Sequence, residues 1–139
     1  MLRTTPEKAG ESRPKIVLVE DDAGVRRSLQ LLLQGRGYEV RAYASGVALL
    51  VDPAASDAAC FIADYRMAEL DGIEILSELR RRKWHGPAVL ITAFTSTELT
   101  RRAIAAGFDT VIAKPFLDHF LVDVIGRLVR GEKSPAIAS

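Results

Sequence analysis

Five short runs of strand length recur along the chain, four of them apolar and one (residues 38–43) alternating between apolar and polar residues. Each is followed by a stretch in which apolar residues have helical spacing. The runs cover residues 15–19, 38–43, 59–64, 88–92 and 110–113. Apolar runs of this length bounded by turn residues are typical of buried strands, whereas a period near 3.6 residues indicates a helix. Alternating strands and helices build a parallel sheet with helices on both faces. The chain is therefore predicted to be an α/β protein with a doubly wound parallel sheet, strand order 2-1-3-4-5 and five flanking helices.

Capping residues indicate where several of these helices begin. Ser45 is expected to begin a short helix that runs to about residue 51 and is closed by Pro53. Asp71 precedes the third helical stretch, and Ser96 or Thr97 precedes the fourth. Side chains of these types accept a hydrogen bond from the first free backbone N–H groups of a helix.

The length of 139 residues fits a single domain, which is predicted to cover residues 15–131. Residues 1–14 mix charges with Pro, Gly and Ser and show no period, so they are expected to form a disordered leader. Residues 132–139 are expected to be a disordered tail. Too few residues follow the last helix for a second domain, so any output is expected to involve a separate partner.

Charge and cysteine content exclude several classes of protein. Nineteen basic and eighteen acidic residues give a formal charge of +1, which offers no overall attraction for nucleic acid or an anionic membrane. No apolar stretch approaches the roughly 20 residues of a membrane helix, and the amino terminus lacks a secretory signal. The single cysteine, Cys60, excludes an internal disulfide and is predicted to be a small core residue. A cytoplasmic protein is expected.

The basic run at residues 80–83 lies in the last turn of the third predicted helix. Cations at this end complement the helix dipole. The run is therefore expected to be a solvated helix end rather than a nucleic-acid patch.

Polar side chains follow the apolar runs at the points where the strands end. Glu20 and Asp21 follow the first run, Asp64 ends the third, Thr92 ends the fourth and Lys114 follows the fifth. In the order 2-1-3-4-5 these four strands are adjacent, so their carboxyl ends meet at one edge of the sheet, where ligands of such sheets bind.

This set of side chains has a chemistry of its own. Carboxylates brought close together suit Mg²⁺, which prefers oxygen ligands. A hydroxyl and an ammonium group beside them can bind the oxygens of a phosphoryl group. The set therefore predicts Mg²⁺-assisted phosphoryl transfer with Asp64 as the nucleophile. The alternative is that the acids following the first strand merely cap a helix and pair with Lys114.

The chain resembles the receiver domain of bacterial two-component response regulators from about residue 15 to residue 130. Each motif is weak alone, and their order and spacing make the resemblance specific. The motifs are Val-Glu-Asp-Asp at residues 19–22, Asp64, Asp71-Gly72, Thr92-Ala93 and Lys114-Pro115-Phe116.

The resemblance implies a flavodoxin-like fold and a phosphoacceptor role for Asp64. The phosphoryl group would come from the phosphohistidine of a sensor histidine kinase or a histidine phosphotransfer protein. By the same resemblance, Asp21, Asp64 and the Arg66 backbone carbonyl bind Mg²⁺ directly, and Glu20 acts through a metal-bound water. The domain would not be an enzyme beyond autocatalytic phosphotransfer and self-dephosphorylation.

The resemblance also assigns roles around the phosphoryl group. Lys114 would hold one phosphoryl oxygen, and Thr92 would swing inward to hydrogen-bond another. The Lys114–Pro115 peptide bond resembles the family's cis bond, and Asp22 is predicted to cap the first helix.

The resemblance implies that output comes from the face formed by the fourth helix, the fifth strand and the fifth helix. Arg101 and Asp118 could pair across a symmetric homodimer, or could simply be solvated. No contact with membrane or nucleic acid is expected of this domain. The residues expected on this face are Thr100, Arg101, Ala105, Thr110, Ile112 and Asp118.

Two residues depart from the family pattern. Ala68 stands where proline is usual, which predicts a less rigid loop after Asp64. Val111 replaces the Tyr or Phe that often switches position in the fifth strand, so Thr92 and the backbone are expected to carry the coupling. Phe94 is a candidate to supply the missing bulk.

Two other functions compete with the phosphoacceptor. One is an interaction module of the same fold that works without phosphorylation, which Ala68 and Val111 favour. The other is a Mg²⁺-dependent phosphatase of the dehalogenase type, which requires an aspartate where this chain has Arg66. A stand-alone regulator, a phosphorelay shuttle and the receiver of a longer transcription factor all stay open.

Overall fold

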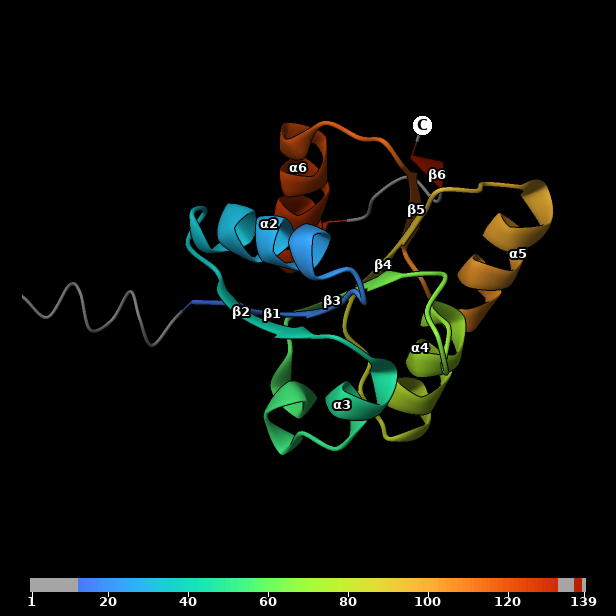
Figure 1. Cartoon of the computed structure of the whole chain (residues 1–139), viewed down its shortest axis with the longest axis horizontal. Coiled ribbons are helices and arrows are strands. Elements are labelled where there is room, and N and C mark those ends of the chain that lie inside the picture. The colour runs from blue at the N-terminus through green and yellow to red at the C-terminus, as the bar shows by residue number, and fades with distance from the viewer. Residues whose placement is uncertain (1–12, 133–136, 139) are drawn as a thin grey trace, which may run out of the picture.

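One parallel sheet organises the chain, and the computed structural model describes residues 13–132 and 137–138 of it. The strands run in the order β2-β1-β3-β4-β5-β6 (Figure 1). The predicted order 2-1-3-4-5 is thus confirmed for the five expected strands. The strands are β1 (Lys15–Val19), β2 (Glu39–Tyr43), β3 (Cys60–Asp64), β4 (Ala88–Thr92), β5 (Thr110–Ala113) and β6 (Ile137–Ala138).

The sixth strand lies in the segment expected to be a disordered tail. Ile137–Ala138 pairs in parallel with β5, so this part of the tail belongs to the sheet. At the other end, Pro14, the last residue of the expected leader, accepts a backbone hydrogen bond of 3.0 Å from Glu39. The rest of the expected leader and tail, residues 1–12, 133–136 and 139, lies outside the described residues.

Five α-helices connect the strands, as predicted. Ser45, Asp71 and Ser96 accept the capping hydrogen bonds expected of them, and Asp71 forms a reciprocal capping box with Glu74. Pro53 begins an extra 3₁₀ helix, η1, that the sequence does not predict. None of the described helices is both long and apolar enough to cross a membrane. The helices are α2 (Ala23–Gln34), α3 (Gly46–Leu50), η1 (Pro53–Asp57), α4 (Gly72–Arg81), α5 (Thr97–Ala106) and α6 (Asp118–Val129).

The helices cover both faces of the sheet. Helices α2 and α6 lie together on one face, and α3, α4 and α5 lie on the other (Figure 1). Strand residues alternate between the two cores: Ile16 and Leu18 of β1 pack with α2 and α6, whereas Val17 and Val19 pack on the opposite side. Apolar residues at consecutive positions are needed because both sides of these strands are buried.

Cys60 lies at the beginning of β3 and is fully buried, as predicted for a core residue. Burial raises the pKa of its thiol far above the ordinary value. The side chain therefore acts as a small apolar group rather than a reactive thiol.

The basic run at the end of α4 differs from its prediction at one position. Arg80 is half-buried, and its guanidinium donates hydrogen bonds to the carbonyls of Trp84, Gly86 and Gly107 at 3.1, 2.8 and 2.9 Å. It also lies 5.1 Å from the centre of the Trp84 ring system. Arg80 therefore joins the end of α4 to the turn after α5, while Arg81 is exposed as expected.

Replacing Arg80 by methionine is expected to lower the free energy of unfolding by about 2 kcal/mol. Methionine keeps the apolar stem and removes every donor, and hydrogen bonds from charged donors contribute roughly 1.5–3 kcal/mol. Denaturant unfolding measures the loss. The matched change Arg81→Met removes an exposed guanidinium bonded to Glu78 and should cost less than about 0.5 kcal/mol. Equal losses in both variants would contradict the structural role of Arg80.

Candidate functional site

The structure brings four of the predicted polar side chains together at the carboxyl edge of the sheet, those of Glu20, Asp21, Asp64 and Lys114. The Lys114 ammonium nitrogen lies 3.0 Å from Asp64 Oδ2 and 3.7 Å from Glu20 Oε1. Asp64 ends β3, Glu20 follows β1 and Lys114 follows β5, so three separate strands deliver these groups. Parallel strands make this possible because their carboxyl ends share one edge.

Three carboxylates form a cluster at this edge. One oxygen each from Glu20, Asp21 and Asp64 lies within 4.8 Å of the others. Glu20 is almost completely buried, Asp64 is half-buried and Asp21 is exposed. The cluster is therefore open to solvent on the Asp21 side and closed at Glu20.

Glu20 is held by contacts that its sequence motif does not reveal. The Asp22 N–H donates to Glu20 Oε2 at 3.0 Å, and the Arg26 guanidinium donates to the Glu20 carbonyl at 2.8 Å. Asp22 itself accepts a 2.9 Å bond from the Val25 N–H, which confirms the predicted cap of α2. Arg26 was not predicted for this site, because only the turn into α2 brings it back to the strand end.

Burial controls the proton affinity of Glu20. It raises the pKa of Glu20 to about 7; the Asp64 charge adds to the rise, and the Asp22 N–H and the Lys114 ammonium oppose it. Burial alone would lower the pKa of Lys114, but its hydrogen bond to Asp64 and the charges of Asp64 and Glu20 outweigh burial and raise it. Lys114 is therefore a cation at neutral pH.

Gly72 lets α4 begin directly beside Asp64. A side chain at this position would place a Cβ 2.7 Å from the Leu90 Cδ1 atom and 3.0 Å from the Asp64 carbonyl oxygen. The Gly72 N–H donates to the Tyr65 carbonyl at 3.1 Å, which fixes the return of the loop after β3. Glycine is needed here for close approach, since its φ is not in the left-handed region.

Thr92 and Lys114 are linked through the backbone of neighbouring strands. The Lys114 N–H donates to the Thr92 carbonyl at 2.8 Å. Thr92 is 1% exposed, and its hydroxyl bonds to the backbone of Phe94. The Lys114–Pro115 peptide bond is cis, as the resemblance implies.

Two exposed side chains from the loops after β3 and β4 contact each other. Arg66, in the loop after β3, has its guanidinium carbon 5.3 Å from the centre of the Phe94 ring, in the loop after β4. Phe94 is 66% exposed, so it does not fill the space beside Val111 as suggested from the sequence. Val111 is buried and packs with Phe108 and other residues on the side of the sheet that α4 and α5 cover.

The expected output face is only partly at the surface. Thr110 and Ile112 are buried at 0% and 1% exposure, because these alternate positions of β5 point towards the core on the α6 side. Arg101, Ala105 and Asp118 are exposed and Thr100 is half-buried. Thr110 and Ile112 are therefore wrongly assigned to the face. Arg101 pairs with Glu98 of its own helix at 2.5 Å.

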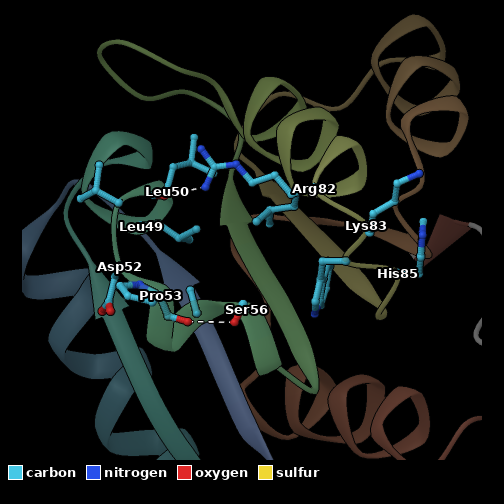
Figure 2. A pocket seen from close by; sticks show the side chains of 12 residues that line it. Leu49, Leu50, Asp52, Pro53, Ser56, Arg82, Lys83 and His85 are labelled. Carbon is cyan, nitrogen blue, oxygen red and sulfur yellow. Dashed lines mark hydrogen bonds between the residues drawn. The ribbon is translucent and has the colours of Figure 1, made fainter.

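A separate hollow of about 410 Å³ lies between α3, η1 and the end of α4. Figure 2 shows Arg82 reaching across it to the Leu50 carbonyl, a bond of 2.6 Å, with Lys83 and His85 at its edge. None of the residues of the carboxylate cluster lines this hollow. The hollow is thus distinct from the candidate site.

The residues at the carboxyl edge fit a small divalent cation. Their free ligands are carboxylate oxygens, and the Lys114 ammonium contacts two of the three carboxyl groups, those of Asp64 and Glu20. Hard cations such as Mg²⁺ take oxygen ligands of this kind. A nearby cation would also favour the ionised form of buried Glu20.

Comparisons with known proteins agree with this geometry. The family model of the response regulator receiver domain matches residues 16–126. Nodulation protein W of Bradyrhizobium diazoefficiens is 34% identical over 110 residues, covering 79% of this chain and 48% of that protein. The C4-dicarboxylate transport transcriptional regulatory protein DctR of Rhodobacter capsulatus is 30% identical over 133 residues, covering 88% and 67%. The chain spans between about half and two thirds of the length of these relatives.

Solved structures give the same result. Chemotaxis protein CheY4 of Vibrio cholerae superposes with a TM-score of 0.78 at 28% identity, covering 84% of this chain and 99% of that one. The crystal structure of FixJ-N gives a TM-score of 0.77 at 27% identity, covering 88% and 98%. The order of the strands, the edge at which the acids meet and these similarities lead to one conclusion: the chain belongs to the response regulator receiver family of two-component signalling.

Proposed function

We propose that Asp64 is the phosphoacceptor of this receiver domain and that Mg²⁺ binds at Asp21, Asp64 and the Arg66 backbone carbonyl, with Glu20 acting through a metal-bound water. The observation that carries the proposal is the contact of Asp64 with Lys114 inside a cluster of three carboxyl groups. Bound Mg²⁺ would supply positive charge for the incoming phosphoryl oxygens.

The chemistry follows from the groups around Asp64. One Asp64 carboxylate oxygen attacks the phosphorus of a phosphohistidine, the P–N bond breaks, and the imidazole leaves with its electron pair. Lys114, which contacts Asp64, would donate to a phosphoryl oxygen. Thr92 ends the neighbouring strand and would donate its hydroxyl proton to a second oxygen.

Acetyl phosphate with Mg²⁺ tests the proposal directly. One phosphoryl mass should appear on the intact protein, and a chelator should prevent it. Failure of the folded, Mg²⁺-loaded protein to take up phosphate from either acetyl phosphate or a histidine kinase would overturn the proposal.

Asp21→Asn is expected to weaken Mg²⁺ binding at least about tenfold. Loss of a group that only orients a metal ligand costs 10- to 100-fold in affinity, so loss of a charged ligand should cost no less. Isothermal titration with Mg²⁺ measures the change. The control Asp22→Asn keeps a good helix cap one residue away and should bind Mg²⁺ nearly as wild type does. Unchanged affinity in Asp21→Asn would remove this residue from the site.

Receiver domains act with kinases and output domains, and the partner surface proposed here is the exposed part of the α5-β5-α6 face. Arg101, Ala105 and Asp118 are its exposed members. A histidine kinase or phosphotransfer protein is the proposed donor, and a homodimer through this face is one form that output could take. We also propose that the protein acts in the cytoplasm.

The competing functions receive less support. Ala68 is exposed in the loop after β3 and Val111 is buried, and neither disturbs the contact between Lys114 and Asp64. A phosphatase of the dehalogenase type needs a second acid two residues after the nucleophile, where Arg66 stands with its guanidinium over Phe94.

A further inference from the structure

Phe94 engages the hydroxyl group on which the proposed phosphoryl site depends. The Phe94 N–H donates to Thr92 Oγ1 at 3.1 Å, and Thr92 Oγ1 donates to the Phe94 carbonyl at 3.3 Å. A threonine hydroxyl has one proton. Thr92 therefore cannot donate to a phosphoryl oxygen and to the Phe94 carbonyl at the same time.

The Phe94 ring is itself contacted by a side chain from the loop after β3. The Arg66 guanidinium carbon lies 5.3 Å from the ring centre, within the range of a cation–π interaction. Within the described residues Arg66 has no carboxylate partner, so the ring is its principal contact. Arg66 follows Asp64 by two residues and Phe94 follows Thr92 by two, on strands that pair directly.

We propose that Arg66 and Phe94 form a latch that keeps the Thr92 hydroxyl bonded to the Phe94 backbone in the unphosphorylated protein. The latch joins the loop of the acceptor to the loop of the hydroxyl donor. Binding of a phosphoryl group requires Thr92 to leave Phe94, so the latch opposes phosphoryl binding and favours its loss. This regulation rests on the proposed function of Asp64.

The latch also gives a physical role to an exposed aromatic residue. Phe94 is 66% exposed, so burial of its ring stabilises the fold little. Its contact with Arg66 instead restrains the backbone segment that holds Thr92. Because residue 111 is valine, β5 has no aromatic side chain at that position. The latch restrains Thr92 without needing an aromatic residue on β5.

The test uses the full chain with Mg²⁺ and beryllium fluoride, an anion that imitates a phosphoryl group on a carboxylate. Phe94→Leu removes the ring face and keeps every charge, so it should bind beryllium fluoride about two- to fivefold more tightly than wild type, the range expected for an exposed cation–π contact. Phe94→Tyr keeps the ring face and should match wild type.

The same change in an Arg66→Gln background completes the test. Loss of the Arg66 charge alters anion binding by itself, so Phe94→Leu is compared within each background. The latch predicts that Phe94→Leu has no effect once Arg66 is absent. Carbon-13 shifts of the Thr92 methyl group, read without any anion, should move in Phe94→Leu and stay in Phe94→Tyr.

The outcomes separate the two proposals. If wild type binds beryllium fluoride tightly and all variants bind it with equal affinity, the latch alone is overturned. An equal gain in affinity from Phe94→Leu in both backgrounds would also overturn the latch alone. Weaker binding by Phe94→Leu would also overturn it. A wild-type protein that accepts neither beryllium fluoride nor a phosphoryl group would overturn the proposed function, and the latch with it.

Discussion

Asp64→Asn is expected to take up no phosphoryl group from acetyl phosphate or a kinase, while the protein keeps its fold. The amide has nearly the shape of the carboxylate but lacks its nucleophilic charge. Its oxygen can still accept the hydrogen bond that Lys114 now makes with Asp64 at 3.0 Å, so the side chains around it have little reason to move. Intact-mass spectrometry after incubation with Mg²⁺ and phosphodonor measures the loss.

Asp71→Asn is the matched control for this experiment. Asp71 is the next aspartate along the chain, and its side chain caps α4 through a 2.8 Å bond from the Glu74 N–H. Asparagine caps helices about as well as aspartate, so the fold should be preserved. This variant should be phosphorylated to the wild-type extent. A phosphoryl adduct that persists in Asp64→Asn would move the acceptor to another carboxylate, with exposed Asp21 the first to examine.

The parts of the fold that depend on neighbouring residues were predictable. Ser45, Asp71 and Ser96 cap helices because each side chain reaches an N–H only three residues away. Four of the five main strands were equally clear, since buried parallel strands consist of continuous apolar runs, and alternation of apolar and polar residues indicated the other, β2. Topology then brings Glu20, Asp64 and the other strand-end groups to one edge without any information on side-chain contacts.

The errors concern contacts that the chain makes over long distances. Arg80 resembles its solvated neighbours in sequence, yet it bonds to the carbonyl of Gly107, which is 27 residues away. Thr110 and Ile112 were assigned to a surface because the sequence pattern of β5 does not show that helices cover both of its faces. Phe94 was expected to fill space beside β5, but the loop after β4 turns it towards Arg66 instead.

The contacts around Glu20 could not have been predicted either. The motif suggests an acidic pair, but the sequence does not show that Arg26 reaches the backbone of Glu20 or that burial raises the pKa of this carboxyl to about 7. The burial of a side chain depends on everything that packs around it, so it is a property of the whole fold. The chemistry of the site was thus predictable in kind, and its electrostatics were not.

Phe61→Ala is expected to lower the free energy of unfolding by about 3–5 kcal/mol, the usual cost of removing a buried phenyl ring. Phe61 is 0% exposed in β3, the middle strand of the five predicted ones. Its ring meets Trp84 edge-on at 6.4 Å and stacks with Phe108 at 6.2 Å between centres. Such pairs add to the stabilisation from burial itself.

The loss at Phe61 should appear as a lower denaturant midpoint with an unchanged slope, because the folded protein keeps its compactness. Phe94→Ala makes the same chemical change at a ring that is 66% exposed, so it should cost less than about 1 kcal/mol. A comparable loss in both variants would mean that ring burial does not determine stability here. A small loss at Phe61 alone would mean that the α3 and α4 side of the core closes around the space left by the ring, since residual cavity volume sets the cost.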